Sequence, residues 1–167
     1  MEAARFEVAF SPLPSPSVSG MEDVRFLFSA NPGEPLKDLV QVASGGELSR
    51  LLLALNLVTG SDQPLLVFDE VDAGTGGLAA VAIGQLLRRL AEGRQVLVVT
   101  HLPQVAAFAG RQYQVEKARE GGRTVTRVRE LDADGRRREL ARMLSGQVTE
   151  ASLQAADELL RASAGTT

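Results

Sequence analysis

The sequence predicts an α/β fold with a mostly parallel central sheet, flanking helices and added antiparallel strands. Two short apolar runs, at 64–68 and 95–99, are typical of central strands that are covered on both faces. Between them, apolar residues recur at helical spacing from 83 to 90 and the segment ends at a glycine. A strand, a helix and a strand in this order predict a right-handed parallel crossover.

Two segments near the N-terminus alternate apolar and polar residues, as half-buried strands do. They are residues 5–10 and 24–29. The intervening segment, 11–20, has proline at every second position from 12 to 16, and proline cannot continue a hydrogen-bond ladder. We therefore expect two strands joined by a long loop. Asn31 to Pro35 has strong turn chemistry and ends the second strand.

A mostly buried helix is predicted after Gly46, because apolar residues cover most of its sides. Further along, residues 113–117 and 124–131 flank a glycine pair and are typical of a hairpin, and residues 138–144 and 150–162 have helical patterns.

We expect these elements to form one domain over 1–167, because the length suits a single core. Its parts would be a strand pair with a proline-rich loop in 1–34, a core in 35–110, and a hairpin with C-terminal helices in 111–167.

The composition excludes several classes of protein. The absence of cysteine rules out disulfides, thiolate metal sites and a cysteine nucleophile. A net charge of -3 lacks the basic footprint of a free-standing DNA-binding domain. No apolar run approaches the roughly 20 residues needed to cross a bilayer, and the start of the chain lacks a signal-peptide pattern. We therefore expect a cytoplasmic protein that does not enter a membrane.

The first candidate site is a glycine turn directly before the predicted buried helix. It consists of Ala43, Ser44, Gly45, Gly46 and Glu47. Glycines let the turn approach a ligand closely, and the amides of the first helical turn attract an anion. The same spacing of Ser44 and Glu47 also suits a capping box, which only stabilises the helix. Both interpretations stay open on this motif alone.

The second candidate is an acid pair, Asp69 and Glu70, at the end of the first apolar run. Carboxylates at the carboxyl ends of parallel strands lie where open α/β sheets bind ligands. In a P-loop enzyme the first acid would serve Mg²⁺, and the second would orient or deprotonate the attacking water. The alternative is that both acids merely leave the strand and cap the next segment of the chain.

The third candidate is His101, the only histidine, which comes after the second apolar run and Thr100. A lone histidine is more often structural than catalytic. This one is expected at the same edge of the sheet as Asp69 and Glu70, where a neutral imidazole can hydrogen-bond a γ-phosphate or a water.

The order of these three motifs resembles the signature, Walker B and switch-histidine series of the ABC ATPases. The resemblance implies the C-terminal lobe of an ABC-type or SMC-type P-loop ATPase head. In that family residues 44–47 would cap the γ-phosphate of ATP held by a partner head, and Asp69 would serve Mg²⁺. Glu70 would be the catalytic base, Asp72 would lie in the loop that crosses the dimer interface, and His101 would be the switch residue.

Four longer segments resemble the RecN family of bacterial double-strand-break repair ATPases, which are relatives of the structural-maintenance-of-chromosomes proteins. They are residues 28–34, 43–50, 68–74 and 100–106. The segment 141–144 also resembles the C-terminal region of that family. The resemblance implies ATP hydrolysis at a head-to-head interface during DNA repair and recombination, in the bacterial cytoplasm at the nucleoid.

No P-loop lysine is present, because Lys37 and Lys117 are the only lysines and neither follows a glycine-rich loop. The resemblance therefore implies that the Walker A half lies far upstream, beyond a long coiled coil. Its implied partners are that half, a second head in a homodimer, and DNA through the full-length protein. The chain alone is expected to be inactive.

Two alternatives to this function remain at the level of the sequence. One is an assembly module that keeps the fold without nucleotide chemistry, and the other is the head of a different ABC family. The arginine cluster at 136–138, with Arg142 one turn on, either contacts DNA phosphates or forms a salt-bridged helix face. The general behaviour of charge runs favours the salt-bridged face.

Overall fold

The computed structural model describes residues 4–29, 33–39, 44–60, 63–120 and 122–165. The predicted turn at 31–35, and Ala43 in the glycine motif, therefore lie partly or wholly outside the described residues. The chain forms two compact units, Met1–Gly45 and Gly46–Thr167. The prediction of a single domain stays a prediction.

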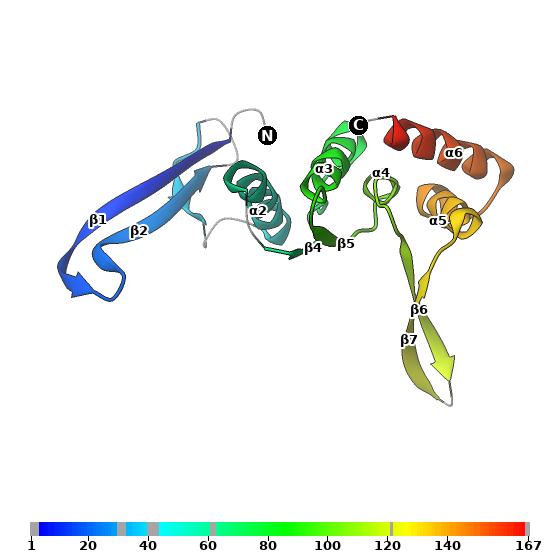
Figure 1. Cartoon of the computed structure of the whole chain (residues 1–167), viewed down its shortest axis with the longest axis horizontal. Coiled ribbons are helices and arrows are strands. Elements are labelled where there is room, and N and C mark those ends of the chain that lie inside the picture. Colours follow the sequence, from blue (N-terminus) through cyan, green and yellow to red (C-terminus); the bar gives the residue numbers. More distant parts are fainter. Residues whose placement is uncertain (1–3, 30–32, 40–43, 61–62, 121, 166–167) are drawn as a thin grey trace. The chain divides into compact units, whose positions relative to one another are not determined.

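The first unit is an antiparallel sheet in the order β1-β2-β3. Its strands are β1 (Arg5–Ser17), β2 (Gly20–Ser29) and β3 (Lys37–Asp38) (Figure 1). The first pairing sets Phe6 opposite Phe28 and Phe10 opposite Val24. Both alternating segments are therefore strands, as predicted, and their aromatic residues share one face.

The predicted long loop between these strands is wrong. β1 continues through its three prolines to Ser17, which pairs with Gly20, so the connection is short. The register shifts between Pro12 and Ser17. Prolines are tolerated here because β1 is an edge strand and because a bulge removes the need for regular ladder bonds.

The second unit is built on a parallel strand pair. Its first elements are α2 (Gly45–Thr59), β4 (Leu65–Asp69), α3 (Gly77–Leu90), β5 (Gln95–Val99) and α4 (Pro103–Ala106). β4 and β5 pair in parallel, with α3 as the crossover, which confirms the predicted parallel unit. Phe68 of β4 packs in a core with Leu53 of α2 and with Ile83 and Leu87 of α3.

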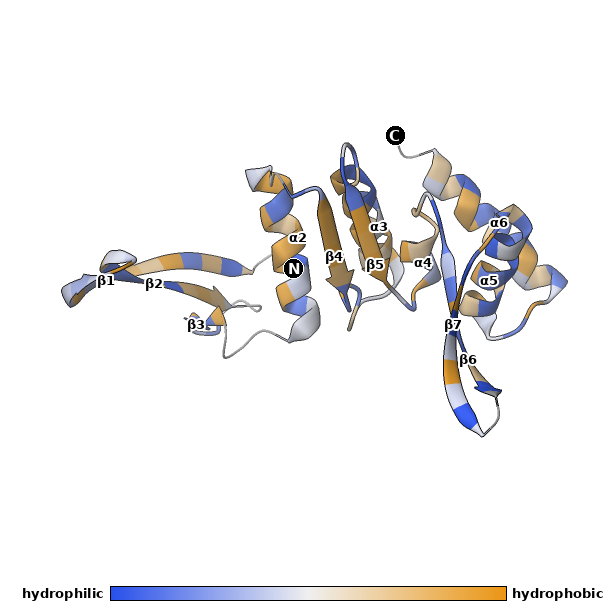
Figure 2. Cartoon of the chain, turned by 60° about the horizontal axis from the view of Figure 1, so that its bottom comes forward, coloured by the Kyte–Doolittle hydropathy of each residue, from blue (hydrophilic) through white to orange (hydrophobic). Residues whose placement is uncertain are grey.

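The predicted cover on both faces of this sheet is wrong for the described chain. Only one face packs into the core, and on the other face Val67 is 55% exposed and Leu97 is 49% exposed. Helix α2 is likewise less buried than predicted, since Leu48 and Leu52 are exposed on one side. Val67 and Leu97 are exposed because α2 and α3 cover one face of the sheet and no second layer of helices covers the other face in the described chain. Figure 2 shows both strands of this pair as strongly apolar.

The remaining elements are a hairpin and two helices. They are β6 (Tyr113–Glu120), β7 (Arg123–Glu130), α5 (Ala133–Ser145) and α6 (Glu150–Ala164). The hairpin is antiparallel and confirms the prediction. Asp132 caps α5, Thr149 caps α6, and the two helices pack around Leu140 and Ala156.

The fold is therefore mixed α/β, but the expectation of a mostly parallel sheet holds only for β4 and β5. The other strand pairs in the described part of the chain are antiparallel. No helix in the described ranges is long and apolar enough to cross a membrane.

Phe108, two residues after the end of α4, packs against Gly84 of α3 and so holds α4 close to α3. A Cβ at Gly84 would overlap the Phe108 ring, whose Cε2 would lie 2.9 Å away. Phe108 is buried, so its ring has little room to move. The absence of a side chain at Gly84 thus lets the segment after His101 pack against α3.

Gly84→Ala should destabilise the chain by up to about 2 kcal/mol. Overpacking costs about 1–3 kcal/mol, and the better helix propensity of alanine offsets about 1 kcal/mol of that. Urea unfolding monitored by circular dichroism measures the change. Gly110→Ala is the control, because a Cβ there meets nothing within 4 Å. Equal midpoints for the two variants would contradict this close packing.

The ion pair between Arg137 of α5 and Asp157 of α6 should make stability depend on pH. The Arg137 hydrogen bond lowers the pKa of Asp157 below its ordinary value. A carboxyl whose pKa is lowered on folding stabilises the fold above its unfolded pKa, and this contribution disappears as the pH falls through the folded pKa. The difference in urea midpoint between wild type and Asp157→Asn should be constant above about pH 5 and shrink below about pH 4. A difference that stays the same down to about pH 2 would refute the linkage.

Candidate functional site

The predicted acid pair and the histidine meet at one edge of the parallel sheet. Asp69 is the last residue of β4 and pairs in register with Val99, the last residue of β5. Glu70 and His101 therefore follow their strands at the same carboxyl edge. Both acids and the histidine are exposed, so the edge is open to a ligand.

Glu70 has an unusual backbone conformation. Its φ is 56°, in the left-handed region that residues other than glycine rarely adopt. The neighbouring structure holds it there: the Ala73 amide donates to the Glu70 carbonyl at 2.9 Å, and the Ser49 hydroxyl donates to the Asp69 carbonyl at 2.9 Å. Strain of this kind gathers at functional sites, where it fixes the direction of a side chain.

Gly46 lies directly against the loop that follows the acid pair. A Cβ at Gly46 would be 2.9 Å from the Ala73 Cβ and 3.0 Å from the Glu70 carbonyl oxygen. Only glycine allows this approach without moving the loop. The second glycine of the predicted turn therefore serves a packing contact that brings α2 to the acid pair.

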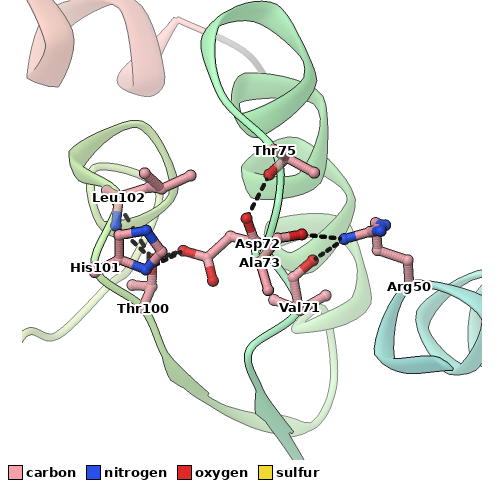
Figure 3. A network of polar contacts seen from close by, with 8 residues as sticks. All are labelled: Arg50, Val71, Asp72, Ala73, Thr75, Thr100, His101 and Leu102. Atoms are coloured by element: carbon pink, nitrogen blue, oxygen red, sulfur yellow. Dashed lines mark hydrogen bonds and ion pairs between the residues drawn. The ribbon is translucent and has the colours of Figure 1, made fainter. Parts of the chain in front are cut away.

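Asp72 is the buried centre of the site. Its side chain is 1% exposed, and its carboxylate accepts a hydrogen bond from the Thr100 hydroxyl. The same carboxylate lies 3.8 Å from Nδ1 of His101, whose side chain is 75% exposed. Figure 3 shows the carboxylate facing both residues of the segment after β5.

Arg50 of α2 holds the other side of the Asp72 loop. Its guanidinium donates to the carbonyl oxygens of Val71 at 3.3 Å and Ala73 at 2.8 Å. These carbonyls flank Asp72, so the arginine fixes the backbone on both sides of the buried acid (Figure 3).

The start of α2 leaves the role of the glycine motif open. The helix begins at Gly45, directly after Ser44, and Glu47 in its first turn is half-buried. This position suits an anion site and a capping arrangement equally well. The direct contacts of Ser44 and Glu47 with nucleotide therefore stay predictions.

The acid edge offers a ligand of the kind that Mg²⁺ prefers. Asp69 offers exposed carboxylate oxygens, which are the ligands this hard cation prefers. Among the described residues, no three histidine or carboxylate side chains converge on one point. An ion at Asp69 would therefore take its other ligands from water and from nucleotide phosphates, as Mg²⁺ commonly does.

Neither lysine lies where a P-loop lysine would. Lys37 is in the short strand β3, and Lys117 is in the hairpin strand β6. A P-loop lysine follows a glycine-rich loop and opens a helix.

The arginine cluster of α5 is engaged within the protein. Arg137 pairs with Asp157 through two hydrogen bonds, and Arg138 pairs with Asp134. Arg142 contacts Glu139, and Arg136 donates to backbone carbonyls. These contacts favour the salt-bridged helix face over a free DNA-binding patch.

Two residues that position the site were not among the predicted site residues. Arg50 is a polar residue inside an otherwise leucine-rich helix, and that mismatch is the signal that could have identified it. Thr100 precedes the histidine, and its hydroxyl gives no periodic signal because its partner Asp72 is 28 residues away.

The comparisons with known proteins identify relatives for nearly the whole chain. DNA repair protein RecN from Deinococcus radiodurans is 58% identical over 160 residues, which cover 96% of this chain and 28% of that protein. DNA repair protein RecN from Vibrio cholerae is 47% identical over 170 residues and is covered to 30%. The chain thus spans less than a third of the length of these relatives. No protein-family model matches the chain.

A solved structure shares the fold. The crystal structure of the Smc head domain with a coiled coil and joint from Pyrococcus yayanosii has a TM-score of 0.54 at 22% identity. The match covers 83% of this chain and 25% of that one. With the sequence matches, it shows that this chain is a RecN homologue over 96% of its length and has the fold of part of an Smc head domain.

Proposed function

We propose that this chain is the part of an SMC-like ATPase head that supplies the signature turn, the acid pair and the switch histidine. Together with a separate Walker A half it would hydrolyse ATP at a head-to-head interface. The names of the relatives support a role in DNA repair, and the full-length protein would contact DNA during double-strand-break repair in the bacterial cytoplasm.

The observation that supports this function best is the convergence of Glu70 and His101 at one sheet edge. The parallel register brings both to the carboxyl ends of their strands, where α/β sheets bind ligands. Glu70 follows its strand at this edge in a left-handed backbone conformation, and strain of this kind gathers at functional sites. If the two side chains only formed surface salt bridges, they would not need to lie at the same sheet edge.

The proposed chemistry is the attack of water on the γ-phosphorus of ATP. Glu70 accepts the proton as the oxygen of the water bonds to phosphorus, and the bond to the β-phosphate oxygen breaks. His101 hydrogen-bonds the γ-phosphate and thereby orients it. Mg²⁺ near Asp69 would neutralise charge on the phosphates.

The open face of the parallel sheet supports the need for another half. Parallel sheets are normally covered on both faces, yet four apolar side chains of β4 and β5 are exposed on one face. They are Leu65, Val67, Leu97 and Val99. A Walker A half that covers this face would bury them and bring the missing lysine to the acid edge.

The start of α2 would act on a different nucleotide. In the proposed homodimer, residues 44–47 cap ATP that is bound by the second head. Asp72, predicted to lie in the interface loop, would then belong to the same closing surface. Head closure on ATP would be the two-state element of the protein.

Glu70→Gln should abolish ATP turnover by this chain mixed with the Walker A half and Mg²⁺. The amide cannot accept the proton from water, so we expect a loss of at least about 100-fold in kcat. The ATP-bound dimer should persist longer, which size-exclusion chromatography with ATP measures.

Glu158→Gln is the matched control, because Glu158 is exposed on α6. Unchanged turnover in Glu70→Gln would remove Glu70 from the catalytic role. If the mixture bound a partner protein but no ATP, the assembly-module interpretation would replace the enzyme.

Val67→Asp should weaken association with the Walker A half. Val67 lies in the middle of the open face, and the loss of one buried valine costs about 1.5–3 kcal/mol, which is tenfold or more in affinity. Val115→Asp is the control, since Val115 is 64% exposed on the hairpin. Isothermal titration calorimetry measures both affinities. Equal binding by the two variants would show that the half docks elsewhere.

A further inference from the structure

Thr100 connects the buried acid to the backbone around His101. Its hydroxyl donates to Asp72 and accepts the Leu102 amide at 3.0 Å. The two bonds therefore fix the residues directly before and after the histidine. The side chain of His101 stays exposed, so it can still contact a ligand although its backbone is held in place.

The Asp72 loop is in turn fixed from several directions. The Thr75 hydroxyl donates to the Asp72 carbonyl at 2.7 Å, and the Thr75 amide donates to the same oxygen at 3.1 Å. Arg50 holds the carbonyls on either side of Asp72. The loop cannot shift without breaking bonds to α2 or to the segment after β5.

The burial of Asp72 makes this network sensitive to each partner. A buried carboxylate is costly unless donors satisfy it, and the Thr100 hydroxyl donates directly to this one. Without the Thr100 hydroxyl, the Asp72 side chain would have to rotate or be hydrated by water. The backbone around His101 would then lose the bonds that hold it in place.

We propose that Arg50, Asp72 and Thr100 form a positioning relay that fixes His101 relative to helix α2. Arg50 lies one helical turn after Gly46, the glycine that packs on the same loop. The start of α2 and the histidine would then move as one body. Asp72 acts here through the fold of its own chain and needs no direct contact with nucleotide.

The consequence for the enzyme rests on the proposed function. There, α2 begins at the turn that caps ATP of the second head, whereas His101 serves ATP of its own head. The relay would hold the imidazole of His101 in a fixed position relative to α2, because Arg50 bonds to the loop that carries Asp72 and Asp72 accepts the bond from Thr100.

The first test uses the imidazole NMR signals of the chain, which are unambiguous because His101 is its only histidine. Thr100→Val removes the hydroxyl, and Arg50→Met removes the donors to the Asp72 loop. Both should move the His101 signals by more than a linewidth toward those of histidine in an unfolded chain. Thr100→Ser keeps the hydroxyl and should restore the wild-type positions.

The controls are Thr126→Val and Arg138→Met, whose side chains are exposed and lie outside the relay. Amide spectra check the fold of each variant, and Arg50→Met provides the measurement should Thr100→Val unfold. Wild-type His101 signals in a folded Arg50→Met or Thr100→Val variant would overturn the relay.

The second test measures ATP hydrolysis by the chain mixed with the Walker A half. Arg50→Met and Thr100→Val should each lower kcat at least tenfold while the KM for ATP changes less than threefold, because orientation is lost and not binding. Arg138→Met should match wild type. Wild-type kcat in both relay variants would overturn the role of the relay in orienting His101 for hydrolysis. If the wild-type mixture is itself inactive, the proposed function fails and the His101 signals decide the relay.

Discussion

The parallel pairing of β4 with β5 is the constraint on which the rest of the second unit depends. A parallel pair cannot be joined by a tight turn, so the chain must cross over through α3, whose apolar side then covers one face of the sheet. The same pairing brings both strand ends to one edge, where Asp69, Glu70 and His101 gather. The same strand pairing thus determines the core and the candidate site. Because α3 covers one face of the pair, the other face stays exposed in the described chain.

A polar network lies beside the apolar core of this unit. Arg50 and Asp72 would each be costly to bury alone, but the bonds to backbone carbonyls and to Thr100 satisfy them. Hydrophobic packing is tolerant of small shifts, whereas hydrogen bonds demand specific positions. The network therefore specifies where the loops after β4 and β5 lie more narrowly than packing could. The proposed site would need that narrower definition, because it would have to orient a phosphate and a water.

Much of the fold could be predicted because its signals are local. Continuous apolar runs identified β4 and β5, and the alternating and helical patterns identified the hairpin and the C-terminal helices. Predictions of burial failed where burial depends on another part of the structure packing against the element. Leu48 of α2 and Val67 of β4 are examples, because nothing in their own segments shows whether they are covered. The prolines of β1 were misjudged because their tolerance depends on an edge position that only the sheet order reveals. Arg50 and Thr100 were missed because bonds between distant residues leave no periodic trace.

Glu70 shows how tightly the fold and the proposed chemistry are joined. Its left-handed backbone would relax if the loop after β4 could move, but Gly46 and Ala73 of the same unit occupy the space around its carbonyl. Relaxation of Glu70 would therefore require α2 to withdraw, and with it Arg50 would release the Asp72 loop. The strain at the acid is thus maintained by the contacts that position the histidine. Backbone strain gathers at functional sites, so the left-handed conformation of Glu70 at the open sheet edge supports the catalytic use that we propose for it.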